Sequence, residues 1–352
     1  MTMSGKIAKT TDPPLQLSLF QNFYGTGAES GGLSNIVDIW DATPKYFVSR
    51  KEMASLRNNG LLPSIERNFE FRDRVFHVRI SPALVTTKNG DIAYYPSSRE
   101  EVVEDALRKI AVKQNCGFIH HTGEFGVKFT LHQLRMELYD CGHGITYPNL
   151  VESLMILAGC SIEITPDKEK AICKSPIIAA LAGVSRDQLR NDGNSRWSAY
   201  FNPMVAESIM TVTYRQYDYD RVMSYRSQIA RWLHKRIANN YTNASIIQPY
   251  NILLSTVKRG SHLLNHTRIR DQVVAMNAAI KELLENPRKP LLWVETSPIP
   301  GSRTNAIKDM KYIMHPSPEF VSFVKAANRR QLDGKQAVEE LKTARLPNTP
   351  HR

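Results

Sequence analysis

Residues 265–287, NHTRIRDQVVAMNAAIKELLENP, decide how the second half of the chain folds. Apolar residues recur there every three or four positions, which predicts an amphipathic helix with one buried face. These residues are Ile269, Val273, Met276, Ile280 and Leu283. The next stretch, PLLWVETSPIPGSRTNAIKDMKYIMHP at 290–316, predicts two strands around a tip rich in proline, glycine and serine. A helix followed by such a hairpin is typical of the second half of a winged helix-turn-helix.

The residues before this helix complete the same pattern. Residues 217–240, YDYDRVMSYRSQIARWLHKRIANN, predict one long helix with an apolar side. That side consists of Val222, Tyr225, Ile229, Leu233 and Ile237. Residues 244–256 predict a short strand and another helix. The order helix, strand, helix, helix and hairpin therefore predicts a winged-helix domain over residues 211–318.

The first half of the chain predicts the same order of elements without repeating the sequence. Residues 97–115 predict a helix that starts with a capping box, formed by Ser97 or Ser98 with Glu100 or Glu101. A short strand with a helix (127–144), another helix (146–160) and a β-rich stretch follow, while Asn89-Gly90 predicts an earlier hairpin. We therefore predict an α+β protein with two winged-helix domains in tandem, over residues 36–210 and 211–318.

Both ends of the chain are predicted to lie outside these domains. Residues 1–35 hold prolines, glycines and serines around the short apolar run QLSLF, and such a segment buries too little apolar surface to fold alone. We predict a flexible N-terminal tail there. Residues 319–352 are predicted to be a basic, polar tail with at most one helix, at 333–344.

The net charge of +12 is unevenly distributed. Residues 1–210 hold 23 basic and 23 acidic side chains, whereas residues 211–352 hold 23 basic and 11 acidic ones. This asymmetry predicts a polyanionic partner for the second domain, nucleic acid above all. We expect no membrane association, because no apolar run is long enough to span a bilayer and no signal-peptide core is seen. The four scattered cysteines predict free thiols in a reducing cytoplasm.

The N-terminal end of the helix at 265–287 is the candidate DNA-reading site. A recognition helix contacts base edges with its N-terminal residues, and arginine pairs with guanine through two hydrogen bonds. The predicted contacts of this end are Asn265, His266, Thr267, Arg268, Arg270 and Asp271. The predicted phosphate contacts are Lys258 and Arg259 in the preceding loop and Arg303, Lys308 and Lys311 in the wing.

The first domain is neutral, so we expect it to contribute backbone contacts, packing between domains or a dimer surface rather than base reading. Tyr214, Tyr217 and Tyr219 would either stack unpaired bases or pack between the domains.

Several stretches of the chain resemble one family, the plasmid replication initiators of the TrfA type. They are IWDATPKYF, IAYYPSSREEVVEDALRKIA, VKFTLHQLRMEL, YFNPMVAESI and YRSQIARWLHKRI, and the last two also resemble initiators of the RepC kind. The resemblance covers residues 36–316, but the N-terminal region is short for the family and the loop at 116–126 has no counterpart. It implies two winged helices that bind repeated duplex sites (iterons) at a plasmid origin, melting of an AT-rich segment with its single strands, and recruitment of host DnaA and the replicative helicase. It also implies a monomer–dimer equilibrium.

The run QLSLF resembles the pentapeptide with which such initiators bind the sliding clamp of DNA polymerase III. The resemblance implies that Gln16 bonds the clamp through its amide, that Leu19 and Phe20 fill apolar pockets, and that Leu17 and Ser18 set the spacing. Alternatively, Leu17 and Phe20 pack back on the domain that follows.

Other functions remain open at this stage. A transcriptional repressor could use the same domains, and a rolling-circle enzyme could nick the origin. Cys116, His120, His121, Cys141 and His143 match no standard zinc spacing, and no phosphate-binding G-x-x-x-x-G-K-[ST] loop occurs. We therefore expect a binding protein with no catalytic residues, no metal and no cofactor.

Overall fold

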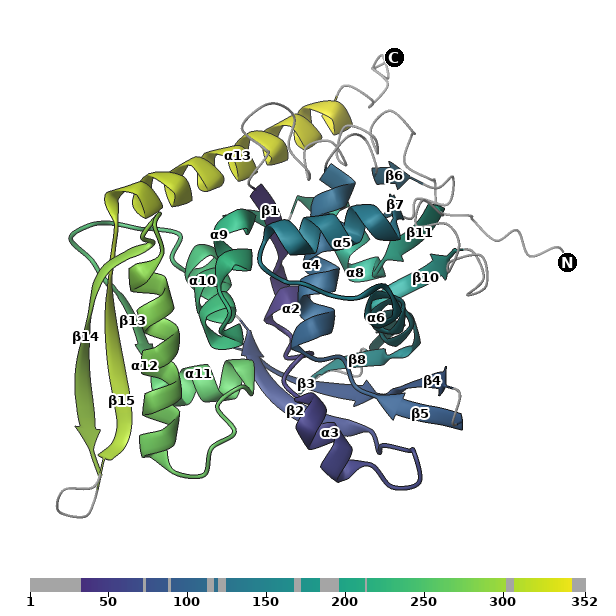
Figure 1. The fold of residues 1–352 in the computed structure, drawn as a ribbon. Coiled ribbons are helices and arrows are strands. Elements are labelled where there is room, and N and C mark those ends of the chain that lie inside the picture. The colour runs from purple at the N-terminus through teal and green to yellow at the C-terminus, as the bar shows by residue number, and fades with distance from the viewer. Residues whose placement is uncertain are drawn as a thin grey trace, which may run out of the picture.

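The computed structural model describes residues 33–71, 74–87, 90–112, 117–119, 125–167, 172–183, 196–212, 214–301 and 307–343 (Figure 1). Helices and antiparallel strands are mixed along the chain, which confirms the α+β class. No helix of the described ranges is both long and apolar enough to cross a membrane.

A first set of elements forms one winged-helix unit, here called the first module. Its strand β11 pairs antiparallel with both β7 and β10, and the sheet has the order β10-β11-β7-β6. In chain order the elements are α4 (Ser98–Val112), β6 (Gly117–Ile119), β7 (Phe125–Thr130), α5 (Leu131–Asp140), α6 (Tyr147–Gly159), β10 (Ile178–Ala182) and β11 (Arg196–Phe201), followed by α8 (Pro203–Thr211). One half of the predicted capping box is confirmed: the Glu100 carboxylate accepts hydrogen bonds from the backbone N–H and the hydroxyl of Ser97, at 2.8 and 2.6 Å.

The second module repeats this order. Its sheet has the order β13-β15-β14, in which the last strand again lies between the other two. The elements are α10 (Gln228–Asn240), β13 (Tyr250–Leu253), α11 (Leu254–Ser261), α12 (Ile269–Glu285), β14 (Leu291–Pro300) and β15 (Ile307–Pro316). The shared order and pairing show two winged-helix units in tandem.

The prediction of one long helix over residues 217–240 is wrong for the first half of that range. The structure has β12 (Tyr214–Asp218), α9 (Tyr219–Ser224) and only then α10. The break arises because Ser227 caps α10, its hydroxyl accepting from the N–H of Ala230, while the Glu282 carboxylate accepts from the N–H groups of Arg226 and Ser227. These bonds hold the backbone of 225–227 out of a continuous helix.

Further strands and two short helices extend the first module. One sheet has the order β2-β3-β8-β9, and a separate hairpin joins β4 to β5. The bounds are α2 (Asp38–Ala42), α3 (Arg50–Leu56), β2 (Ile65–Phe71), β3 (Arg74–Ser81), β4 (Ala83–Thr87), β5 (Gly90–Tyr94), β8 (Ser161–Pro166) and β9 (Cys173–Pro176). Thr87 pairs with Gly90, so the predicted hairpin forms, and Asn89 lies outside the described residues.

Two hydrophobic cores underlie the modules. The first consists of residues between Val37 and Met223 together with Ala238 and Val338, and the second of residues between Tyr225 and Val324. Strand β1 (Leu33–Val37) pairs with β12, so residues from the start of the chain lie beside the segment that enters the second module.

The predicted polar tail is largely a helix instead. α13 (Pro318–Thr343) has 26 residues and runs from the second module across the first (Figure 1). It folds because Phe320, Val321 and Val324, spaced for one helix face, are buried in the second core, while Val338 near its other end is buried in the first. The sequence analysis missed this apolar face.

Candidate nucleic-acid interface

The N-terminal end of α12 is held in place by one buried side chain. The Gln272 amide donates a hydrogen bond to the backbone oxygen of His266 at 2.5 Å, and Gln272 itself is buried. The N-cap residue is Arg268, whose side chain makes no capping bond. The loop before α12 is thereby fixed while its charged side chains stay in solvent.

The structure brings the predicted base-reading residues together. Asn265, His266, Thr267, Arg268, Arg270 and Asp271 are all exposed around the first turn of α12. Arg268 and Arg270 have no ion pair within the part of the chain that the structure describes. A helix start with two uncommitted guanidinium groups attracts phosphate and can reach base edges.

The outer face of α12 continues past the predicted residues. The exposed residues of this face occupy the positions between the buried ones along the helix. They are Arg270, Val274, Asn277, Ala278 and Lys281. Val274 is 62% exposed, although it is a large apolar residue. The sequence analysis missed Val274, Asn277, Ala278 and Lys281, yet the signal was present, since they occupy the face opposite Met276 and Ile280.

The predicted phosphate contacts are spread over two elements. Lys258 and Arg259 lie in the last turn of α11, rather than in a loop, and both are exposed. Nη2 of Arg259 is 3.8 Å from Oε2 of Glu70 on β2, so this arginine is shared with the first module. Lys308 is exposed near the wing tip, whereas Lys311 is half-buried in the central strand of the sheet. Arg303 lies outside the described residues.

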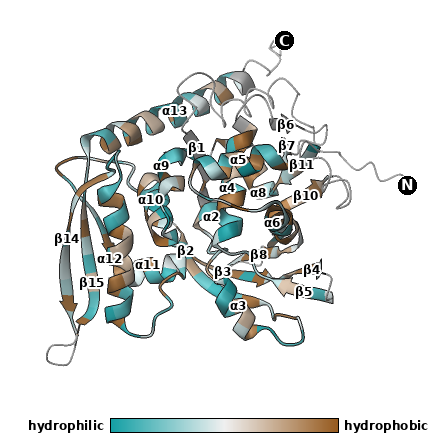
Figure 2. Cartoon of the chain, in the orientation of Figure 1, coloured by the Kyte–Doolittle hydropathy of each residue, from teal (hydrophilic) through white to brown (hydrophobic). Residues whose placement is uncertain are grey.

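The corresponding helix of the first module, α6, contains no basic residue. Leu150, Val151, Ile156 and Leu157 are buried, and Figure 2 shows hydrophobic residues along this helix. A Cβ added to Gly159 at the end of α6 would lie 3.0 Å from the Cβ of Ala83, because the β4–β5 hairpin packs directly on the helix. The expected role of the first module, in backbone contacts, packing between domains or a dimer surface rather than base reading, stays a prediction.

Buried ion pairs join the modules through α10 and α4. The guanidinium of Arg231 lies 2.9 Å from the Glu101 carboxylate, and Nζ of Lys235 lies 2.6 Å from that of Asp105. Burial alone would lower the pKa of Lys235, but the Asp105 carboxylate raises it above its ordinary value, so Lys235 is charged.

The three tyrosines that the sequence offered for base stacking, Tyr214, Tyr217 and Tyr219, are buried near these ion pairs, and burial raises the pKa of each. Tyr214, Tyr217 and Tyr219 therefore pack inside the protein and cannot stack on bases in this arrangement.

Most of the remaining candidates fall outside the part of the chain that the structure describes. Cys116, His120 and His121 lie outside the described residues, as does the clamp peptide from Gln16 to Phe20. His143 bonds the backbone oxygen of Met223 at 2.8 Å. Across the described ranges no three His, Cys, Asp or Glu side chains are grouped to hold a metal ion.

The sequence matches no protein-family model, and no curated protein matches it. Among solved structures, domains 2 and 3 of RctB align with 79% of this chain and 96% of theirs, at 10% identity and a TM-score of 0.48. A second structure of RctB domains 2–3 covers 74% of this chain and 94% of its own, at 9% identity and a TM-score of 0.45. The Pi initiator protein in complex with iteron DNA covers 62% and 94%, at 13% identity and a TM-score of 0.41. The winged-helix assignment rests on the order and pairing of the elements.

Proposed function

We propose that this chain is a replication initiator that binds repeated sites in duplex origin DNA through its second module. The observation that carries the proposal is the exposed outer face of α12, with Arg268 and Arg270 at its start, in the part of the chain, residues 211–352, that holds the excess of positive charge. The N-terminal end of α12 enters the major groove, and the wing between β14 and β15 lies along the flanking backbone.

The chemistry of this face suits sequence-specific reading. Arg268 or Arg270 pairs with guanine through two hydrogen bonds, Asn277 can do the same with adenine, and the methyl groups of Val274 fit against a thymine methyl. Lys258 and Lys308, on either side, neutralise phosphates and fix the register.

The place of this binding in replication rests on the sequence resemblance. We propose that the chain melts an AT-rich segment and engages its single strands, and that it recruits DnaA, the replicative helicase and, through Gln16–Phe20, the sliding clamp. We also propose that it exchanges between monomer and dimer, acts in the cytoplasm, and does no chemistry of its own.

The test uses the purified full chain and the origin of the replicon that encodes it. Footprinting should protect repeated sites in register, and titration against a scrambled duplex at several salt concentrations should show a preference that survives added salt. Equal affinity for both duplexes would overturn the proposal. Supercoiled origin DNA incubated with Mg²⁺ should stay unnicked, since nicking would instead support an origin-cleaving enzyme.

A further inference from the structure

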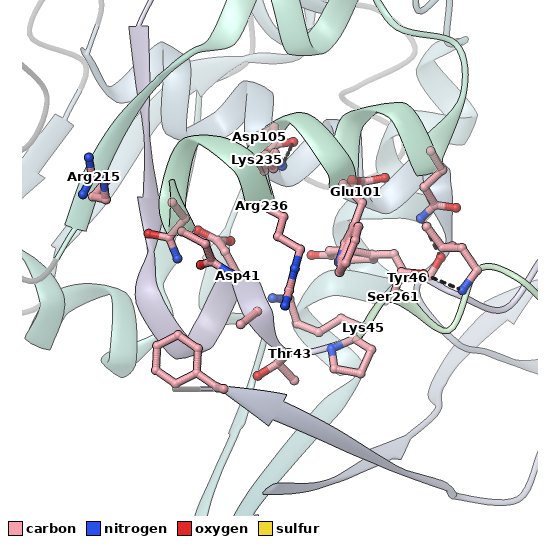
Figure 3. A pocket seen from close by; sticks show the side chains of 18 of the residues that line it. Asp41, Thr43, Lys45, Tyr46, Glu101, Asp105, Arg215, Lys235, Arg236 and Ser261 are labelled. Atoms are coloured by element: carbon pink, nitrogen blue, oxygen red, sulfur yellow. Dashed lines mark hydrogen bonds and ion pairs between the residues drawn. The ribbon is translucent and has the colours of Figure 1, made fainter. Parts of the chain in front are cut away.

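A hollow of about 670 Å³ lies between the two modules, away from α12 (Figure 3). The first module contributes residues 41–47, the end of β2 and one side of α4, and the second contributes α10, while α13 closes the rim. The volume is in the range of small-molecule sites in proteins, which also tend to form between domains.

The acidic side chains around this hollow are all paired with cations, several of which come from outside its lining. Each carboxylate of the lining has a cation beside it: Asp41 and Glu104 face Arg108, Glu101 faces Arg231, Asp105 faces Lys235, and Glu70 is near Arg259. Three of these cations, Arg108, Arg231 and Arg259, come from outside the lining. The acidic lining is therefore neutralised, and its own cations are left in excess.

Arg236 is the cation that stands out. It points from α10 into the hollow (Figure 3), and its guanidinium has no carboxylate or carbonyl partner among the residues that the structure describes. Its Nε is buried without a hydrogen bond, as is the Nε of Arg231 on the same helix, but Arg231 bonds through both of its Nη atoms. A buried donor without a partner loses free energy unless a ligand or water satisfies it.

The surroundings of Arg236 favour an anion that carries a ring. The guanidinium lies 5.1 Å from the Trp232 ring, and Lys335 on α13 supplies a second cation at the rim. The side chains of Asn239 and Thr242 offer hydrogen-bonding groups, and Phe71 adds a flat apolar wall. A planar guanidinium with free N–H groups matches phosphate geometry.

We propose that this hollow binds a nucleotide, with Arg236 on its phosphates. Because the ligand would touch both modules and α13 together, binding would stabilise their arrangement and raise the melting temperature. The site has no phosphate-binding glycine loop, so the proposal concerns binding and not hydrolysis.

The experiment is calorimetric titration of the DNA-free full chain with ATP, ADP, pyrophosphate and adenosine. We expect ATP and ADP to bind, pyrophosphate to bind more weakly, and adenosine to lose at least about tenfold in affinity. Arg236→Ala should lose at least about tenfold, and Arg236→Lys should lose less, because lysine keeps the charge but not the fork of donors. Arg135→Ala, which changes an exposed arginine on α5 that does not line the hollow, is the matched control and should bind like the parent chain.

Three results would overturn the proposal: no heat from any nucleotide at about 1 mM, equal affinity in Arg236→Ala, or loss of nucleotide binding in Arg268→Ala/Arg270→Ala. The last would place the nucleotide on the DNA-reading face. Arg236→Gln, which keeps the length and polarity of the side chain, serves if Arg236→Ala does not fold. The result is independent of the proposed function, since Arg236→Ala should still prefer origin repeats over scrambled duplex.

Discussion

The imidazole Nε2 of His262, in the turn between α11 and α12, lies 2.9 Å from the backbone oxygen of Asn68 on β2. The ring also packs 5.5 Å from that of Phe47, and burial lowers its pKa, so the neutral ring donates this hydrogen bond at pH 7. The turn that precedes α12 is thus tied to the first module. His262 has a φ of +54°, a conformation in which glycine would be unstrained.

Substitutions at His262 should separate the hydrogen bond from the backbone strain. We expect His262→Ala to destabilise the chain by about 1–2 kcal/mol, because it loses the bond and keeps the strain. His262→Gly should lose less, since glycine adopts positive φ freely. Urea unfolding measures both. If His262→Ala and His262→Gly lose the same unfolding free energy, the positive φ at this position does not strain the backbone measurably.

The buried pair Arg231–Glu101 should be sensitive to the loss of one partner. Arg231 is 1% exposed, so Arg231→Met leaves the Glu101 carboxylate buried without its cation. We expect a loss of about 3–5 kcal/mol in unfolding free energy, part of which Glu101→Leu should restore in the double variant. Lys281→Ala, in the exposed pair with Glu285, should change stability by less than about 1 kcal/mol. Similar losses at both pairs would contradict this account.

Residues of the α12 face and the flanking lysines should differ in their effect on DNA binding. Arg268→Ala, Arg270→Ala and Asn277→Ala should each lower affinity for the origin repeat and relax sequence preference, by about 1–3 kcal/mol per lost base contact. Lys258→Ala and Lys311→Ala should weaken binding to all duplexes alike and reduce the salt slope by about one. The test is titration of repeat and random duplexes across a salt series. Because Lys311 is half-buried in the sheet, an unchanged slope in its variant would remove it from the backbone contacts.

Arg135→Ala provides the control for this series. Arg135 is exposed on α5 of the first module, where its guanidinium lies 5.0 Å from the Tyr147 ring. We expect its variant to bind both duplexes like the parent chain. A specific loss there would show that the first module also reads bases.

The clamp peptide should be separable from DNA binding. Leu19→Ala/Phe20→Ala should abolish retention on immobilised sliding clamp, because both apolar anchors of the pentapeptide are removed. Affinity for the origin repeat should be unchanged in the same preparation. Retention equal to that of the parent chain would remove the clamp from the list of partners.

Stability should fall as the solution becomes acidic. Burial lowers the pKa of His234 from 6.5 to about 3, so between these values the unfolded chain binds a proton that the folded chain refuses. Proton binding stabilises the unfolded state relative to the folded state as the pH falls. The unfolding free energy should therefore drop by about 1 kcal/mol per pH unit from this group alone. Burial lowers the pKa of His143 and His262 in the same direction. Denaturant unfolding at several pH values between 7 and 5 measures this effect. The unfolding free energy of His234→Gln should fall less steeply with decreasing pH than that of the parent chain.

The sequence alone determined the helix at α12, its buried side and its basic N-terminal end, because all three follow from the local spacing of Ile269, Val273 and Met276 around a 3.6-residue turn. It also determined the two-fold recurrence of helix, helix and hairpin, and one half of the capping box of Ser97 with Glu100. These features depend on residues that are near neighbours in the chain.

Only the tertiary structure decided what covers each helix. The β4–β5 hairpin that packs on α6, the Glu282 carboxylate that interrupts the helix at 225–227, and the course of α13 over both cores all join residues far apart in the chain. The spacing of apolar residues shows that a face will be buried but not which partner will bury it, since any apolar surface of suitable shape removes it equally from water. For that reason the two modules look alike in sequence pattern, although the outer face of α12 is exposed and the β4–β5 hairpin packs on α6.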